Sequence, residues 1–148
     1  MTDTMTATSD DKLPQDPTLW ATLHDGYFAE VTAPDPTTLR LRVRILYLAE
    51  RLTPPAEAVR ITLHGVVHAD YTRWGAKYPT PLIDLIDDQV DIVGAVAKDP
   101  GILIHNGEGE LYLQYDHATL TDDNHEPLAL ATLRQTAKSY WADFSKRT

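Results

Sequence analysis

The alternation of apolar and polar positions predicts several short strands in the first half of the chain. Residues 38–47 alternate aliphatic with arginine side chains, so a strand there has one apolar and one cationic face. Residues 59–64 alternate aliphatic with polar side chains, and Gly65 interrupts the strand, in the manner of a β-bulge, before it continues to Tyr71. Residues 27–32 predict a further strand, which a Pro-rich turn separates from the next.

The second half of the chain adds a hairpin and an ambiguous segment. Residues 102–118 alternate on both sides of an Asn-Gly pair, which is the strongest local hairpin signal because both residues tolerate positive φ. Residues 82–97 begin with helical spacing and continue with β-branched residues. We expect a short helical turn there, followed by a strand.

Two helices frame the strands. Asp16 as N-cap and Pro17 as the first helical residue predict a short helix that ends near residue 26. A longer helix is predicted from residue 126 or 127 to Lys146, because its apolar residues fall on one stripe. That stripe contains Leu130, Leu133, Ala137, Tyr140, Trp141 and Phe144.

Together these elements predict an α+β fold. We expect an antiparallel sheet of about five or six strands, covered by the long C-terminal helix, with the short helix near the N-terminus. Residues 16–148 are expected to form one domain, and the Thr/Asp-rich residues 1–15 a flexible polar tail. The tail has neither a secretory nor a transit-peptide pattern, so a cytoplasmic location is expected by default.

Composition narrows the possible functions. The 148 residues include no cysteine, which excludes disulfides, thiol nucleophiles and cysteine-ligated metal centres. No apolar stretch approaches the roughly 18 residues of a membrane helix. With 13 Lys and Arg against 22 Asp and Glu, the net charge of −9 disfavours a nucleic-acid partner. No nucleotide-binding or nucleophile motif is present, so neither a cofactor nor a catalytic residue is predicted.

The charge is distributed in blocks of alternating sign. Residues 1–38 carry −6 (one basic, seven acidic) and residues 39–77 carry +4 (seven basic, three acidic). Residues 78–126 carry −10 (one basic, eleven acidic) and residues 127–148 carry +3 (four basic, one acidic). The distribution raises the question of where the basic block lies in the fold.

An arginine row is the first candidate site. Arg40, Arg42 and Arg44 are expected on one face of a strand, with Arg60 on a neighbouring strand. Such a row can bind an anionic ligand through bidentate hydrogen bonds. The alternative, which the charge balance favours, is that these arginines pair with acids of residues 78–126.

Four carboxylates form the second candidate site. Asp84, Asp87, Asp88 and Asp91 would share one face if the segment were helical. They lack the spacing of a calcium loop. The simplest interpretation is a solvated acidic face, and the functional one is a docking surface for a basic protein partner.

The histidines were considered as metal ligands. His64, His68 and Asp70 would point the same way from an uninterrupted strand, but His64 and His68 would then lie about 13 Å apart, too far to share one ion. No metal site is therefore predicted from this segment. A site that also uses His105 or other distant histidines (His117 and His125) stays open.

These observations support two functional hypotheses. The leading one is a non-enzymatic protein-interaction module that binds a basic partner through an acidic surface. The alternative is a domain that binds a small anionic ligand, with possible hydrolytic or metal-assisted activity, through the arginine row and scattered histidines. In architecture and charge the chain is similar to some acidic single-domain immunity proteins of bacterial toxin systems.

Overall fold

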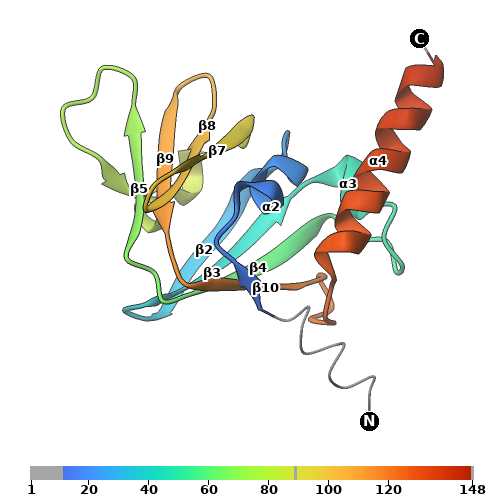
Figure 1. Ribbon diagram of the computed structural model, residues 1–148, viewed down its shortest axis with the longest axis horizontal. Coiled ribbons are helices and arrows are strands. Elements are labelled where there is room, and N and C mark those ends of the chain that lie inside the picture. The colour runs from blue at the N-terminus through green and yellow to red at the C-terminus, as the bar shows by residue number, and fades with distance from the viewer. Residues whose placement is uncertain (1–11, 89, 148) are drawn as a thin grey trace.

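The computed structural model describes residues 12–88 and 90–147, without the side chains of residues 86–88 and 147 (Figure 1). The elements, in chain order, are β1 (Leu13–Pro14), α2 (Pro17–Thr22), β2 (Tyr27–Asp35), β3 (Thr38–Arg44), α3 (Leu46–Ala49), β4 (Ala58–His64), β5 (His68–Arg73), β6 (Thr80–Pro81), the 3-10 helix η1 (Leu82–Asp88), β7 (Gly94–Lys98), β8 (Gly101–His105), β9 (Gly109–Gln114), β10 (His117–Thr121) and α4 (Leu130–Arg147). The predicted α+β class is confirmed. The helical turn followed by a strand, expected within residues 82–97, is confirmed as η1 and β7.

The strands form two antiparallel sheets of five strands each. Sheet A has the order β1-β10-β4-β3-β2, and sheet B has the order β6-β5-β9-β8-β7. Sheet B stands at one end of the molecule, and sheet A extends from it toward α4 (Figure 1). The strands thus divide between two sheets, where the apolar pattern had suggested one of five or six.

One pair of antiparallel segments runs from sheet A into sheet B: β4 leads into β5, and its neighbour β9 leads into β10. Gly65 has a φ of 69°, and the chain turns there from β4 into β5. The segment that pairs with it turns between β9 and β10, where Asp116 N donates to His64 O at 2.8 Å. Beyond the corner, Val67 N donates to Gln114 O at 2.8 Å. Because hydrogen bonds flank the corner on both sides, the two sheets are joined through continuous backbone pairing.

The opposite edges of the two sheets also meet. Phe28 N at the start of β2 donates to Val90 O at 3.0 Å, and Ile92 N donates to Gly26 O at 2.8 Å. Residues 90–92, which precede β7, thus extend sheet A before the chain enters sheet B. The structure is accordingly closer to a barrel than to an open sheet under a helix.

One core joins both sheets and the helices. It contains aliphatic residues from the inner faces of β3, β4, β8 and β9, together with Leu133 and Ala137 of α4. Trp20 of α2 lies at its centre with no exposed surface. Its indole Nε1 donates to the Tyr115 hydroxyl at 3.0 Å, and its ring contacts Phe28 with centroids 6.1 Å apart.

The short first helix begins as its sequence predicts. The Asp16 side chain accepts a hydrogen bond from Thr18 N at 2.7 Å, and Pro17 follows as the first helical residue. That hydrogen bond lowers the pKa of Asp16. The N-cap thereby fixes the direction in which Trp20 enters the core.

The boundary of the predicted N-terminal tail differs from the expectation. Residues 1–11 lie outside the described residues, but Leu13–Pro14 pairs with β10. Gln15 then binds in two places: its Nε2 donates to Pro100 O at 2.8 Å, and its Oε1 accepts from Tyr115 N at 2.8 Å. Residues 13–15 therefore belong to the folded domain.

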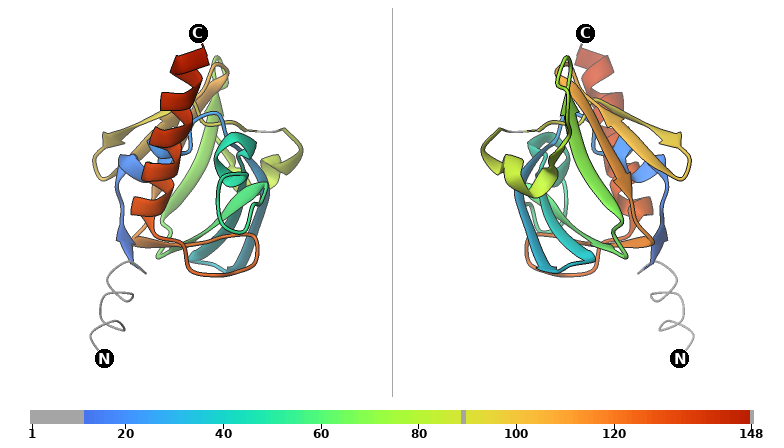
Figure 2. Two further views of the ribbon diagram at one scale, coloured as in Figure 1. Left: turned by 90° about the vertical axis from the view of Figure 1, so that its right-hand side faces the viewer. Right: turned by 90° about the vertical axis from the view of Figure 1, so that its left-hand side faces the viewer.

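The long helix packs on other helices. α4 begins at Leu130, later than predicted, and lies between α2 and α3 (Figure 2, left). The Trp141 ring stacks on His24 with centroids 5.2 Å apart, and Asp143 pairs with Arg51 of the segment after α3 at 3.0 Å. Its apolar stripe was expected to cover the sheet, yet both sheets contribute their inner faces to the common core. The helix instead seals the side of that core at α2 and α3.

Candidate functional site

The four predicted arginines lie together on the outer face of sheet A. Along β3 the apolar side chains Leu39, Leu41 and Val43 are buried, so the intervening arginines face away from the core. Arg60 of β4 is the cross-strand partner of Arg42. The structure therefore brings the predicted row together on one face.

One carboxylate holds the centre of the row. Asp123 accepts two hydrogen bonds from Arg42, at 3.1 Å from Nε and 3.0 Å from Nη2. Its Oδ1 also lies 3.4 Å from Arg60 Nε. The hydrogen bonds from Arg42 lower the pKa of Asp123, and the same contact raises the pKa of Arg42. Glu30 adds a longer contact of 3.8 Å to Arg42.

The ion pairs show which carboxylates neutralise the arginines of the basic block. Arg44 pairs with Glu57 at 3.3 Å, so carboxylates reach three of the four arginines. Among these partners only Asp123 belongs to residues 78–126. Within the described part of the chain, the arginine row therefore forms ion pairs with one carboxylate of the acidic block, Asp123.

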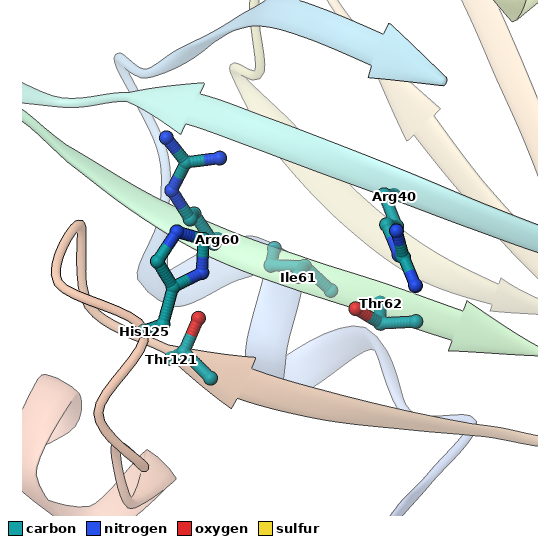
Figure 3. Close-up of a pocket in the computed structure, with 6 residues that line it drawn as sticks. All are labelled: Arg40, Arg60, Ile61, Thr62, Thr121 and His125. Carbon is teal, nitrogen blue, oxygen red and sulfur yellow. The ribbon is translucent and has the colours of Figure 1, made fainter. Parts of the chain in front are cut away.

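Arg40 differs from the other three arginines. No ion pair or hydrogen bond joins its side chain to the residues that the structure describes. It borders a surface cavity of about 350 Å³ with Arg60, Ile61, Thr62, Thr121 and His125. Figure 3 shows the Arg40 side chain reaching toward Thr62, and the His125 ring between Arg60 and Thr121. The cavity thus gathers cationic groups and hydroxyls at one place.

The sequence pattern does not predict Asp123, Thr62 or Thr121 as neighbours of the arginine row, and it indicates His125 only as a possible metal ligand. Asp123 and His125 lie on the loop that follows β10, and only the fold carries that loop back over β3 and β4. Thr121 ends β10. The loop's sequence indicated a polar junction with several possible N-caps, but no local signal pointed to arginines some eighty residues away.

The four carboxylates of the second predicted site do not form one helical face. η1 has non-helical backbone at Leu85, and Asp91 lies beyond the helix, where it forms a β-bridge with Tyr27. Asp84 and Asp91 are exposed. The side chains of Asp87 and Asp88 lie outside the described residues.

Sheet B and its loops nevertheless form an acidic half. We define the acidic half as residues 66–116, which contain β5 to β9. It has three basic and nine acidic residues, a net charge of −6, whereas residues 27–64, with β2 to β4, carry five basic and four acidic residues, a net charge of +1. The acidic half is therefore more negative than β2 to β4 and the segments that connect them.

The histidines are dispersed over the molecule. His64 stacks on His117 in sheet A with ring centroids 4.5 Å apart, whereas His68 lies in sheet B, with Nδ1 3.5 Å from Asp70 Oδ2. His105 packs against Gly94 on β7. Among the described residues, no group of three or more His, Asp or Glu side chains is placed to hold a metal ion.

The stacked pair makes His64 sensitive to pH. Burial lowers the pKa of His64, and the neighbouring His117 and Lys12 lower it further, whereas Asp35 and Asp116 raise it. Between the lowered folded-state pKa and about 6.5, the unfolded chain binds more protons at this residue. Its contribution to stability is therefore full above about pH 6.5 and decreases as the pH falls through that interval.

Replacing His117 by asparagine is expected to raise the pKa of His64, because one of its two positive neighbours is removed. Burial remains, so the pKa should stay below the ordinary value. Titration of the His64 Cε1–H signal by NMR measures the change, and His125→Asn, in the loop after β10, is the control. An unchanged pKa of His64 in His117→Asn would contradict this electrostatic account.

The comparisons with known proteins leave the chain without an assigned family. No protein-family model, curated protein or solved structure matches it. In the part of the chain that the structure describes, no helix is long and apolar enough to cross a membrane. Its function must therefore be argued from its own residues.

Proposed function

We propose that this chain is a non-enzymatic protein-interaction module that binds a basic protein partner through its acidic half. The observation that supports the proposal is the coincidence of negative charge and exposed apolar side chains in the acidic half. A surface that combines both is suited to a partner with cationic and apolar groups. The resemblance to immunity proteins would make a basic toxin domain one such partner.

The exposed apolar side chains concentrate on this half. Of the eight large exposed hydrophobic side chains among the described residues, six belong to the acidic half: Val67, Trp74, Tyr78, Ile83, Val93 and Val96. The other two are Leu46 of α3 and Phe144 of α4. Single exposed apolar residues are ordinary, but their accumulation in one sheet and its loops favours a contact surface there.

Two aromatic residues in the loop after β5 are suited to anchor a partner. Trp74 is 57% exposed and Tyr78 is 71% exposed. The loop is ordered, because Trp74 N donates to Glu108 O at 2.9 Å and Ala76 N donates to Arg73 O at 2.9 Å. Tryptophan and tyrosine are enriched among the residues that dominate binding energies. Their presentation on a fixed loop lowers the entropic cost of binding.

The negative charge would act mainly on association. A charge of −6 on one half of a small domain steers a basic partner toward that half and disfavours acidic competitors. Asp84 and Asp91 of the second predicted site contribute to this field from its rim. Binding should accordingly weaken as the salt concentration rises.

Affinity capture from native cell extract tests the proposal. The immobilised chain should retain a basic protein at low salt and release it at high salt. The double substitution Trp74→Ala/Tyr78→Ala should weaken retention at least about tenfold, because two anchors are lost.

The matched control is Leu46→Ala/Phe144→Ala, which truncates the two exposed apolar side chains outside the acidic half. It should retain the protein as the wild type does. The proposal is wrong if no protein is retained at low salt, or if both double variants retain it equally well.

A further inference from the structure

We propose that the cavity on the outer face of sheet A is a binding site for the phosphate group of a small-molecule phosphate monoester. This site is distinct from the acidic half, and it does not depend on the function proposed above. The inference starts from the six residues that line the cavity: Arg40, Arg60, Ile61, Thr62, Thr121 and His125. None of these residues is acidic.

The arginines on this face outnumber the carboxylates that form ion pairs with them. Arg40, Arg42 and Arg60 contribute three positive charges, and the partners Asp123 and Glu30 contribute two negative ones. One cationic charge is therefore left over. Arg40, which has no ion pair among the described residues, is the group that carries it at the cavity.

The hydrogen-bonding groups that face the cavity are donors. Asp123 is occupied by Arg42 and Arg60, so its oxygens are already bound. Neither Thr62 nor Thr121 has a side-chain hydrogen bond to another described residue, and the His125 ring likewise has none. Arg40 and Thr62 lie at one end of the lining, and Thr121 and His125 lie at the other (Figure 3), so the guanidinium and hydroxyl of the first end can donate to the oxygens of a phosphate.

The loop that carries His125 is held in place before any ligand arrives. The buried Asp122 side chain accepts hydrogen bonds from Asn124 N at 2.8 Å and Glu126 N at 3.0 Å. His125 has a φ of 64°, a left-handed conformation that is unfavourable for residues with a Cβ. The Asp122 bonds hold this turn closed, and the turn places the His125 ring beside Arg60 (Figure 3).

Size and charge favour a phosphate ester over a simple carboxylate. A volume of about 350 Å³ lies at the lower end of the range for small-molecule sites, roughly 300–1,000 Å³. It has room for a phosphate and part of the group that the phosphate is attached to. A phosphate monoester is close to doubly negative at pH 7.5, and a planar guanidinium such as that of Arg40 binds two of its oxygens at once.

Titration with inorganic phosphate, followed by ¹H–¹⁵N NMR at constant ionic strength and pH 7.5, tests the site. Wild type should show saturable shifts at the amides of Arg40, Thr62, Thr121 and His125. Glycerol phosphate should bind at least as tightly as phosphate, and acetate more weakly. Acetate binding tighter than phosphate would overturn the assignment of the ligand class.

Substitutions identify the groups responsible. Arg40→Ala should weaken phosphate binding about tenfold, because it removes the unpaired cation. Thr62→Val, which keeps the shape and removes one hydroxyl, should weaken it about threefold. Arg44→Ala removes an equal charge from the same strand outside the cavity and should leave binding unchanged. Equal affinity in wild type and Arg40→Ala, or an equal loss in Arg44→Ala, would overturn the proposal.

Discussion

Trp20→Ala is expected to lower the free energy of unfolding by about 3–5 kcal/mol, the usual cost of deleting a large aromatic side chain from a core. Trp20 has no exposed surface, and the core that it fills is shared by both sheets. Its loss would leave a cavity and would remove the partner of the Tyr115 hydroxyl. A domain of this size has a total stability of about 5–15 kcal/mol, so the variant would lose a large fraction of it.

Denaturation by urea, followed by circular dichroism, measures the effect. Trp74→Ala removes the same type of side chain from an exposed loop and should change the free energy of unfolding by less than about 0.5 kcal/mol. Similar losses in the two variants would show that Trp20 is not the centre of the core.

Asn106→Ala is expected to cost about 2–4 kcal/mol of stability, although it removes only a small polar side chain. Asn106 Oδ1 accepts three hydrogen bonds, from the Tyr71 hydroxyl, Glu108 N and Gly109 N, at 3.0, 2.8 and 2.9 Å. Its Nδ2 donates to Asp91 O at 3.1 Å. Because Asn106 is buried, its removal leaves these groups without partners away from water.

Two further substitutions isolate the cause. Asn106→Asp keeps the acceptor and loses the bond to Asp91 O, so its stability should lie between wild type and alanine. Asn124→Ala removes an exposed asparagine from another turn and should be close to neutral. Chemical denaturation of the three variants gives the comparison, and a neutral Asn106→Ala would contradict the role assigned to its side chain.

Asn106 also shows what local sequence can and cannot predict. The Asn-Gly pair predicts the hairpin correctly, because turn preference depends on a few adjacent residues. That the same side chain would tie the hairpin to Tyr71 of β5 and to Asp91 could not be predicted, since both partners are distant along the chain. Likewise, Gly65 predicts a local irregularity, but the hydrogen bond from Asp116 N to the neighbouring His64 O, which the sequence does not predict, places it at a corner between two sheets.

The candidate sites show the same difference between features set by adjacent residues and contacts between residues distant along the chain. Strand periodicity places Arg40, Arg42 and Arg44 on the same face of β3, so the sequence predicts their common orientation. The hydrogen bonds from Arg42 to Asp123 could not be predicted, because the loop that carries Asp123 reaches β3 only through the pairing of β10 with β4. The exposure of Trp74 could not be predicted either, because an aromatic residue in a loop is as compatible with burial as with exposure.

The corner between the sheets has a consequence for how this fold can be divided. All of sheet B lies within one uninterrupted segment between β4 and β10, so in covalent terms it is a cassette inserted into sheet A. At the insertion point His64 and His117 are already register partners, close enough for a short turn to join them. Excision would nevertheless expose the inner face of sheet A, because the cassette supplies the other half of its core. A single continuous gene segment therefore encodes the acidic half and can be replaced as one unit. The replacement must supply an apolar face that fits the inner face of sheet A.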